Sequence, residues 1–488
     1  MNKIIIRHLI IGIICIVPAR SSGENYMVST VTELTTALGK VAGGDTIFIR
    51  AGTYASTKTI SLSKSGTSVK PICFMVNPGD ERPLFDFSGT GSSRGFSLSG
   101  SYWHIKGIRV HNAGDNGMII TGDNNTVEYC DFFENGDSGC QLGGGASNNR
   151  IINCDAYYNR DFSEGNADGF SPKLDVGSGN YFKGCRAWQN SDDGFDGYLR
   201  PSDDVTTTYE ECWCYKNGYR KDGTAGTGNG NGFKMGGSDN KALRHNVVLK
   251  NCLSAGNRVT GFDQNNTKGS MTLYNCTAFS NGINYGIDGT VLASGKTLTL
   301  TNCISAGKGA VSLKGGTITT CSWSNGISVS NKDFISVDSS AMTGPRKSDG
   351  SLPEITFMHL APTSALIDAG TPIDSMAFAG SKPDLGCFET GTGTGTILLT
   401  GRGPSSFFKI VPVSPDGLFK IILPVHLKAG VNLMLSDLSG RRVMNFRRAN
   451  SQAAGSDIVV DLRRSCPGNY LCRVGSKDAA LVKRVVRR

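Results

Sequence analysis

Seven cysteines recur along the middle of the chain at intervals of 24, 31, 27, 40, 24 and 27 residues. Six of them are followed five residues later by asparagine, whereas the last, Cys303, has Lys308 in that place. The six pairs of positions are Cys130 and Asn135, Cys154 and Asn159, Cys185 and Asn190, Cys212 and Asn217, Cys252 and Asn257, and Cys276 and Asn281. A unit of this size cannot bury its apolar side alone, so the units must stack. The repeat predicts a three-sided coil with loops of variable length between its strands.

The repeated cysteines and asparagines are expected to be structural. On stacked coils the cysteines would form an inward-facing line of small apolar side chains. The asparagines would form a hydrogen-bonded ladder inside a turn. The chain contains 15 cysteines, but this spacing argues against a disulfide framework. A zinc site is not expected either, because Cys212 and Cys214 have no partner pair at metal-site spacing.

The composition and the N-terminal pattern support an all-β fold. The chain has 64 glycines and 16 prolines but only 8% aromatic residues, which indicates many turns between short strands. Residues 30–41 have a capping residue and apolar positions at helical spacing, and residues 46–49 read as a strand. A short helix that leads into a first strand resembles the N-terminal cap of right-handed parallel β-helix proteins. The predicted fold is therefore a right-handed parallel β-helix, followed by a small C-terminal β-sandwich.

Four segments are expected along the chain. Residues 1–19 look like a signal peptide, since Lys3 and Arg7 flank an apolar run that is too short to span a bilayer. No other stretch could be a transmembrane helix. The remaining segments are a β-helix catalytic domain at residues 25–390, a Gly/Thr linker at residues 391–403, and a basic β-sandwich at residues 404–488 that serves secretion or attachment.

The positive charge belongs to the C-terminal tail. Residues 401–488 contain 16 Lys/Arg and 5 Asp, whereas the other 400 residues carry 34 Lys/Arg against 36 Asp/Glu. The formal net charge of +9 therefore gives little support for nucleic-acid binding. A basic tail suits retention at a surface. We expect a secreted or cell-surface protein that is a monomer and has no nucleic-acid partner.

A short phrase built on Gly-Phe occurs four times between Asn166 and Asp263. When the four copies are aligned on Gly-Phe, the column two residues before Phe holds Asp168, Asp193, Asn231 and Thr260. The column just after Phe holds Ser171, Asp196, Lys234 and Asp263. If the copies lie on successive coils, neighbours in a column are about 4.8 Å apart, the spacing of adjacent strands. We therefore expect Asp168 beside Asp193, and Asp196 beside Lys234.

Carboxylates crowded this closely repel one another unless a cation lies between them. Lys234 would be the one basic group at the rim of this acidic cluster. Asp-Gly and Asn-Gly also simply make turns, which would be the default interpretation of any one aspartate. The convergence of several carboxylates and a lysine on two columns favours a functional site instead.

The same phrases resemble polysaccharide lyase family 9. The resemblance rests on residues 166–170, 184–196 and 231–237, and it covers most of residues 28–390 in architecture. The family comprises calcium-dependent pectate lyases and relatives on a right-handed parallel β-helix. The resemblance implies that Asp168, Asp192, Asp193 and Asp196 bind Ca²⁺ and that Lys234 is the base. The implied substrate is an acidic plant cell-wall polysaccharide.

These residue types suit β-elimination on a uronide. The base removes the proton on C5, next to the carboxylate, and Ca²⁺ would stabilise the charge that builds up there. Four aspartates with water and substrate match the six to eight oxygen ligands that calcium takes. Lysine normally titrates near 10.4; nearby calcium would lower that pKa and Asp196 would raise it. We expect an alkaline optimum.

Three alternatives to a polygalacturonate lyase stay open. The family includes lyases that act on rhamnogalacturonan I, and the motifs do not separate the two backbones. A non-catalytic carbohydrate-binding β-helix would keep all function without Lys234. A β-helix glycosidase would need paired acids and no calcium cage, and unsaturated products would exclude it.

Overall fold

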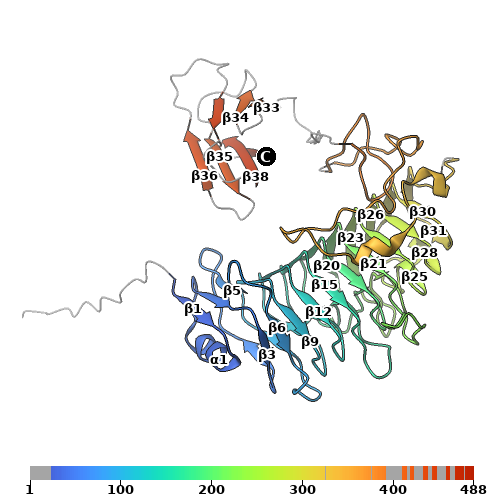
Figure 1. Ribbon diagram of the computed structural model, residues 1–488. Helices are drawn as coiled ribbons and strands as arrows, with labels where there is room; N and C mark the ends of the chain where they lie inside the picture. Colours follow the sequence, from blue (N-terminus) through green and yellow to red (C-terminus); the bar gives the residue numbers. More distant parts are fainter. Residues whose placement is uncertain are drawn as a thin grey trace, which may run out of the picture. The chain divides into compact units, whose positions relative to one another are not determined.

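The computed structural model describes residues 23–324, 326–374 and 376–391, together with the strands between residues 409 and 487 (Figure 1). Three parallel sheets stack coil upon coil through the first part of the chain. The predicted parallel β-helix is confirmed. The predicted segments at residues 1–19 and 391–403 lie outside the described residues, apart from Gly391, so the segment boundaries stay predictions.

The first sheet has 12 strands. They are β1 (Asn25–Val28), β2 (Thr46–Ile49), β5 (Ile72–Val76), β8 (Trp103–Lys106), β11 (Thr126–Glu128), β14 (Arg150–Ile152), β17 (Asn180–Lys183), β20 (Val205–Glu210), β23 (His245–Lys250), β26 (Met271–Tyr274), β29 (Leu298–Thr301) and β32 (Thr317–Thr319). The second sheet has 10 strands. They are β3 (Thr53–Ala55), β6 (Leu84–Asp86), β9 (Arg109–His111), β12 (Asp131–Phe133), β15 (Asp155–Tyr157), β18 (Arg186–Trp188), β21 (Trp213–Tyr215), β24 (Leu253–Ala255), β27 (Thr277–Phe279) and β30 (Ile304–Ala306).

The third sheet also has 10 strands, and we call it the site sheet. They are β4 (Ile60–Leu62), β7 (Phe96–Leu98), β10 (Met118–Ile120), β13 (Cys140–Leu142), β16 (Phe170–Pro172), β19 (Phe195–Asp196), β22 (Phe233–Lys234), β25 (Thr260–Asp263), β28 (Ile283–Asp288) and β31 (Ala310–Lys314). Each coil runs from the site sheet to the first sheet, then to the second sheet, and returns through a turn to the site sheet. That last turn carries the repeated asparagines.

A short helix precedes the solenoid, as the sequence predicts. Helix α1 (Val31–Lys40) begins after Thr30, whose hydroxyl accepts a hydrogen bond from the Glu33 amide at 3.1 Å. Leu34 and Ala37 are its buried residues. This N-cap satisfies one of the amide groups that the first helical turn leaves without a partner.

The repeated residues form two internal ladders. All seven repeat cysteines are fully buried and free of disulfides. The asparagine side chains form a chain of amide hydrogen bonds from coil to coil, and the Asn190–Asn217 and Asn217–Asn257 links are both 2.9 Å long. Both structural interpretations are confirmed. The ladder ends at Asn281, whose amide donates to Asn284 at 3.0 Å, so each of these buried side chains has a hydrogen-bond partner and its burial carries no unpaired cost.

The Gly-Phe phrases align as a stack of aromatic rings inside the solenoid. Phe195 lies 5.2 Å from Phe170 and 4.9 Å from Phe233, measured between ring centroids, and Phe233 lies 5.2 Å from Phe262. All four rings are at most 1% exposed. Successive side chains of a strand point to opposite faces, so the residue that follows each Phe faces outward. The aromatic stack thus fixes the register of the site sheet.

Residues 321–391 pack on the outside of the second sheet. This segment contains the short helices η2 (Asn331–Asp333) and η3 (Ser339–Thr343); η1 (Gly289–Val291) precedes it. Met342, Phe357 and Leu360 are among its residues that are buried in a cluster with the strands of the second sheet. Arg346 also reaches a buried carboxylate there, Asp155, at 2.7 Å. The segment therefore covers a face of the sheet that would otherwise expose apolar side chains to water.

The C-terminal strands form a separate compact unit. Its strands β33 (Lys409–Ser414), β34 (Leu418–Ile422) and β37 (Ile458–Asp461) make one antiparallel sheet, and β35 (Asn432–Asp437), β36 (Arg442–Arg447), β38 (Gly468–Ser476) and β39 (Ala479–Arg487) make another. Two antiparallel sheets are what the predicted β-sandwich requires. Within the described part of the chain, no helix is both long enough and apolar enough to cross a bilayer.

Candidate metal centre and reaction site

The site lies on the outer face of the site sheet, where β16, β19 and β22 are neighbours. Phe170 is paired with Phe195, and Phe195 with Phe233. In the same register, Asp196 is the direct neighbour of Lys234. The Asp193 amide donates a hydrogen bond to Asp168 Oδ1 at 3.1 Å. Both neighbour relations expected from the two columns are therefore confirmed.

Three buried carboxylates come together at this place. Oxygen atoms of Asp168, Asp192 and Asp193 all lie within 4.8 Å of one another. The three residues are at most 2% exposed. Asp192 lies one residue outside the column, yet the turn before β19 brings its carboxylate to the other two. Hydrogen bonds from Ser138 and Ser171 to Asp168 Oδ2, at 3.1 and 2.9 Å, help to orient that side chain.

Lys234 lies against this cluster. Its Nζ atom is 3.0 Å from Asp193 Oδ2 and 3.5 Å from Asp196 Oδ1. Lys234 follows the inward-facing Phe233, so its side chain faces outward from the solenoid. Only 8% of that side chain is exposed, so it is nearly covered. Nζ also lies 5.6 Å from the centre of the Tyr198 ring. The amine is thus placed at the rim of the acidic cluster, where the sequence predicts it.

Asp196 is placed differently from the other three aspartates. It is not part of the close set of three carboxylates. Its carboxylate lies between two ammonium groups, Lys234 at 3.5 Å and Lys173 at 3.7 Å. The Tyr198 amide donates to Asp196 Oδ1 at 3.0 Å. The role of Asp196 as a fourth Ca²⁺ ligand therefore stays a prediction, because its carboxylate does not lie with the other three.

Lys173 is a residue of this site that the sequence interpretation missed. Its Nζ atom is 2.7 Å from Asp168 Oδ2, and its side chain is 4% exposed. It also donates to the Asn166 carbonyl at 3.2 Å. Lys173 lies two residues after Ser171, which is already in a predicted column, and the period of two along a strand places both on one face. That spacing was the available signal.

The charges of the site shift several pKa values. Burial, reinforced by Asp193 and Asp168, raises the pKa of Asp192 to about 9. Burial also raises the pKa of Asp168 to about 6, although Lys173 opposes this. Burial would lower the pKa of Lys234, but the negative charges of Asp193 and Asp196 outweigh it and raise that pKa well above its ordinary value. In the absence of a metal, the lysine is held as an ammonium ion.

These shifts predict that the metal-free protein loses stability as the pH rises. A carboxyl group whose pKa is raised by folding stabilises the folded state fully below its unfolded pKa, near 3.8, and the benefit disappears as the pH rises through the folded pKa. For Asp168 and Asp192 the window runs from about pH 4 to about pH 9. Urea unfolding of the metal-free protein at several pH values measures this trend. Asp192→Asn is expected to flatten it, and an equally steep curve for that variant would contradict the assignment.

One buried oxygen of the cluster lacks a hydrogen bond. Among the described residues, no donor has hydrogen-bond geometry toward Asp193 Oδ2, although Lys234 Nζ lies 3.0 Å away as an ion pair. A buried carboxylate oxygen without a donor is costly unless a charge compensates for it. An all-oxygen set of three carboxylates is also the donor type that calcium prefers. The residues present therefore fit a divalent cation of that class.

The loop after β21 closes over the cluster. It fills the 40-residue interval of the repeat, and its Asn229 amide donates a hydrogen bond to Asp192 Oδ1. The Asn231 amide donates to Asp193 Oδ1 at 2.8 Å. A side chain at Gly228 would collide with the Ser191 carbonyl at 2.4 Å. The inserted loop thus contacts the site directly, as its position before Lys234 suggests.

The nearby arginines and tryptophans have packing partners. Arg220 is paired with Glu164, and Arg244 with Asp203, each at 2.6 Å. Arg200 is paired with Asp239 at the surface. The Trp188 ring stacks on Tyr157 with 4.3 Å between ring centroids, and Trp213 is buried against Phe388. Both tryptophans therefore pack against neighbouring aromatic side chains.

Comparison with known proteins places this architecture among pectin-degrading enzymes. Residues 17–302 match the family described as "Pel9A-like, right handed beta helix region". The sequence is 39% identical over 384 residues to pectate lyase L of Dickeya chrysanthemi, covering 76% of this chain and 88% of that protein. The structure is similar to that of pectate lyase Pel9A, with a TM-score of 0.70 and 36% identity over 76% of this chain and 97% of the other. It is also similar to a rhamnogalacturonan lyase, with a TM-score of 0.62 and 26% identity over 70% and 97% of the two chains.

Proposed function

This chain belongs to the Pel9A-like family of right-handed β-helix proteins, and from that premise we propose that it is a polysaccharide lyase that cleaves pectate by β-elimination. The observation that supports this most is the placement of a nearly covered amine, Lys234 Nζ, 3.0 Å from a carboxylate of the three-aspartate cluster. Relatives named as pectate lyases align along most of their own length with this chain.

Lys234 is proposed as the base. In its neutral form, its amine would take the proton from C5 of a galacturonate unit. The electron pair of the broken C5–H bond then forms a double bond between C4 and C5, and the bond from C4 to the glycosidic oxygen breaks. The departing oxygen takes up a proton, so the products are an unsaturated uronide and a new reducing end. The adjacent carboxylates of Asp193 and Asp196 hold Lys234 in place for this transfer.

Calcium is proposed as the ion of the acidic cluster. Asp168, Asp192 and Asp193 would hold it, and the family resemblance adds Asp196. When bound, calcium supplies positive charge that stabilises the negative charge building up on the substrate carboxylate. Lys173 neutralises Asp168 from the other side, so the cluster has a fixed counter-charge whether or not the ion is present.

Lys234 also explains the alkaline optimum that we expect. Its raised pKa in the metal-free state means that the active, neutral amine is a minor form at neutral pH. A higher pH increases that form. The alkaline pH optimum is therefore a prediction that depends on Lys234 acting as the base.

A rhamnogalacturonan lyase is the second candidate. It is favoured by the structural similarity to a protein of that activity at 26% identity. The acidic cluster and Lys234 would serve the same elimination on its galacturonate units. Action outside the cell is part of the proposal and rests on the resemblance of residues 1–19 to a signal peptide. The acidic polymer follows from the relatives named as pectate lyases, and a monomer stays an expectation.

The test is the ultraviolet absorbance of the unsaturated uronide. The purified full-length protein is incubated with polygalacturonate and with rhamnogalacturonan, each with calcium and with a chelator. We expect the signal to rise with calcium on polygalacturonate and to fall at least about tenfold with the chelator, since a metal ion supplies several kcal/mol of charge stabilisation. A rise on rhamnogalacturonan alone supports the second candidate. Equal rates with and without chelator would contradict the proposed calcium role.

A further inference from the structure

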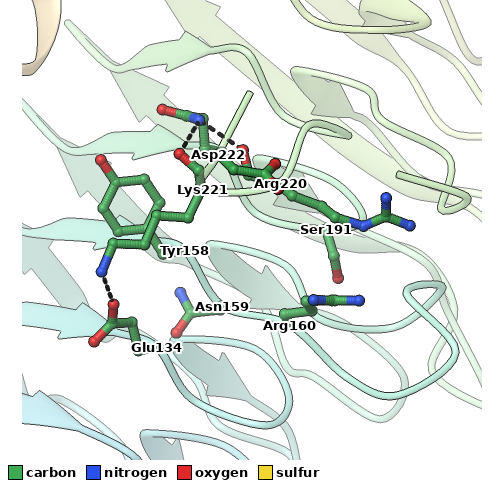
Figure 2. A pocket seen from close by; sticks show the side chains of 9 residues that line it. Glu134, Tyr158, Asn159, Arg160, Ser191, Arg220, Lys221 and Asp222 are labelled. Carbon is green, nitrogen blue, oxygen red and sulfur yellow. Dashed lines mark hydrogen bonds and ion pairs between the residues drawn. The ribbon is translucent and has the colours of Figure 1, made fainter. Parts of the chain in front are cut away.

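A cavity of about 320 Å³ lies beside the acidic cluster, in the turns that follow β15, β18 and β21 (Figure 2). Its lining includes Tyr158, Arg160, Ser191, Arg220 and Lys221. Ser191 immediately precedes Asp192 of the cluster. The cavity volume is within the range of about 300–1,000 Å³ that small-molecule sites occupy. None of its lining residues belongs to the reaction site described above.

The cavity continues along the solenoid toward earlier coils. A second cavity of about 610 Å³ shares Glu134, Tyr158 and Arg160 with the first and extends to Asn112 and Gly136. The two together follow the turns after β6, β9, β12, β15, β18 and β21. Adjacent coils are about 4.8 Å apart, so six turns span roughly 24 Å. This length suits a chain of several sugar units rather than one small molecule.

A buried polar atom in the first cavity has no partner. Ser191 is 2% exposed, and among the described residues its Oγ atom makes no hydrogen bond. Figure 2 shows Ser191 among the residues that line the cavity. A buried hydroxyl without a partner is unfavourable. A ligand hydroxyl or carboxylate in the cavity would satisfy it.

Two basic groups of the cavity, Arg160 and Lys221, are well exposed. Their side chains are 56% and 65% exposed, whereas Glu164, which is not a lining residue but pairs with Arg160 at 2.7 Å, is only 3% exposed. Glu164 also binds Arg220 and is therefore fully engaged beneath the arginines. Glu134 is paired with Lys221. A ligand that enters from solvent can therefore reach the Arg160 guanidinium and the Lys221 ammonium group directly.

The lining also offers an aromatic surface next to these charges. Lys221 Nζ lies 5.2 Å from the centre of the Tyr158 ring. Asp222, the remaining acid of the lining, is turned back into its own loop, where it accepts hydrogen bonds from the Thr224 amide and hydroxyl at 2.9 and 2.7 Å. An aromatic face beside exposed cations is suited to a sugar ring that carries a carboxylate.

We propose that this cavity is a subsite for an acidic sugar unit of the polymer, away from the bond that is cleaved. Arg160 and Lys221 bind the carboxylate of that unit, Tyr158 contacts its ring, and Ser191 hydrogen-bonds one of its polar groups. The inference rests on the proposed function, because it takes the polymer to be a chain of uronate units. It adds a place of recognition outside the acidic cluster.

The test measures binding separately from cleavage. A saturated galacturonate hexamer is titrated calorimetrically, with calcium present, into Lys234→Met and into Lys234→Met carrying Arg160→Gln. We expect the second change to weaken binding at least about tenfold, since a hydrogen bond to a charged group is commonly worth that factor. Binding to the Lys234→Met background can be measured without cleavage of the hexamer. The result therefore tests the subsite independently of the proposed elimination.

Arg150→Gln is the matched control. Arg150 also lies over a tyrosine ring, Tyr181, at 4.8 Å, but on the first sheet. In the otherwise unchanged enzyme, Arg160→Gln is expected to raise KM for polygalacturonate about tenfold while kcat stays within about twofold, as loss of uniform binding does. The subsite is refuted if Arg160→Gln and Arg150→Gln have the same hexamer affinity, or if Arg160→Gln lowers kcat and leaves KM unchanged.

Discussion

Replacing Lys234 with methionine is expected to lower kcat on polygalacturonate by about a thousandfold. A positioned acid–base group contributes typically 10²–10⁴-fold to the rate, and the described site offers Lys234 Nζ as the amine at the open rim of the carboxylates. Methionine keeps the length of the buried stem but removes the amine. Initial rates of unsaturated product, measured with calcium at several pH values, give the ratio.

Lys216→Met is the matched control for this prediction. Lys216 is an exposed residue directly after β21, and its Nζ atom lies 5.0 Å from the centre of the Tyr215 ring. Its replacement is expected to leave kcat unchanged. Circular dichroism and urea unfolding of Lys234→Met would establish that the β-helix is intact. A folded Lys234→Met protein that keeps more than about a tenth of the rate would remove Lys234 from the role of base.

Removing the Asp155 carboxylate is expected to give the largest loss of stability. Asp155 receives hydrogen bonds from Arg186 Nε at 2.8 Å and from Arg346 Nη2 at 2.7 Å. The two arginine side chains are 4% and 3% exposed. Loss of one partner of a buried ion pair commonly costs about 3–5 kcal/mol, because a buried charge is left uncompensated. We expect Asp155→Ala to lower the free energy of unfolding by that amount, as measured in urea.

Asp203→Ala provides the comparison at the surface. Asp203 is paired with Arg244 at 2.6 Å, but both side chains are 36% exposed. Surface pairs contribute about 0–1 kcal/mol, so the expected change is small. If both variants unfold at the same urea concentration, the buried network does not anchor residues 321–391 to the second sheet. Limited proteolysis of that segment in Asp155→Ala gives a second, local measurement.

The repeat and the Gly-Phe phrases were sufficient to predict the solenoid and the site's register. Stacking of identical phrases forces Phe195 onto Phe233, and from this Asp196 must lie beside Lys234. In-register parallel strands leave no freedom in which residues are neighbours, so aligned phrases must lie side by side. The same periodicity explains why the cysteine and asparagine ladders could be predicted from spacing alone.

Two features of the structure were not predicted from the sequence. Lys173 follows Ser171 at the two-residue spacing of one strand face, but it stands outside the two aligned columns, and the structure brings its Nζ within 2.7 Å of Asp168. Arg346 is separated from Asp155 by 191 residues, and no periodicity connects them. The Asp196 carboxylate points toward Lys173 and Lys234. Side-chain rotamers and the local charge balance set this orientation, and the aligned sequence phrases do not predict either.

The long interval of the repeat has a consequence for how such an enzyme diversifies. Asn217 and Asn257 remain joined at 2.9 Å although 40 residues separate them, so the extra chain loops outward and leaves the spacing of the coils intact. Residues of this excursion that precede Gly228 can therefore be exchanged, lengthened or shortened, whereas the Asn229 and Asn231 amides keep holding Asp192 and Asp193. Changes in this loop can therefore alter which pectic polymer is preferred, while the carboxylates and Lys234 keep the chemistry of cleavage unchanged.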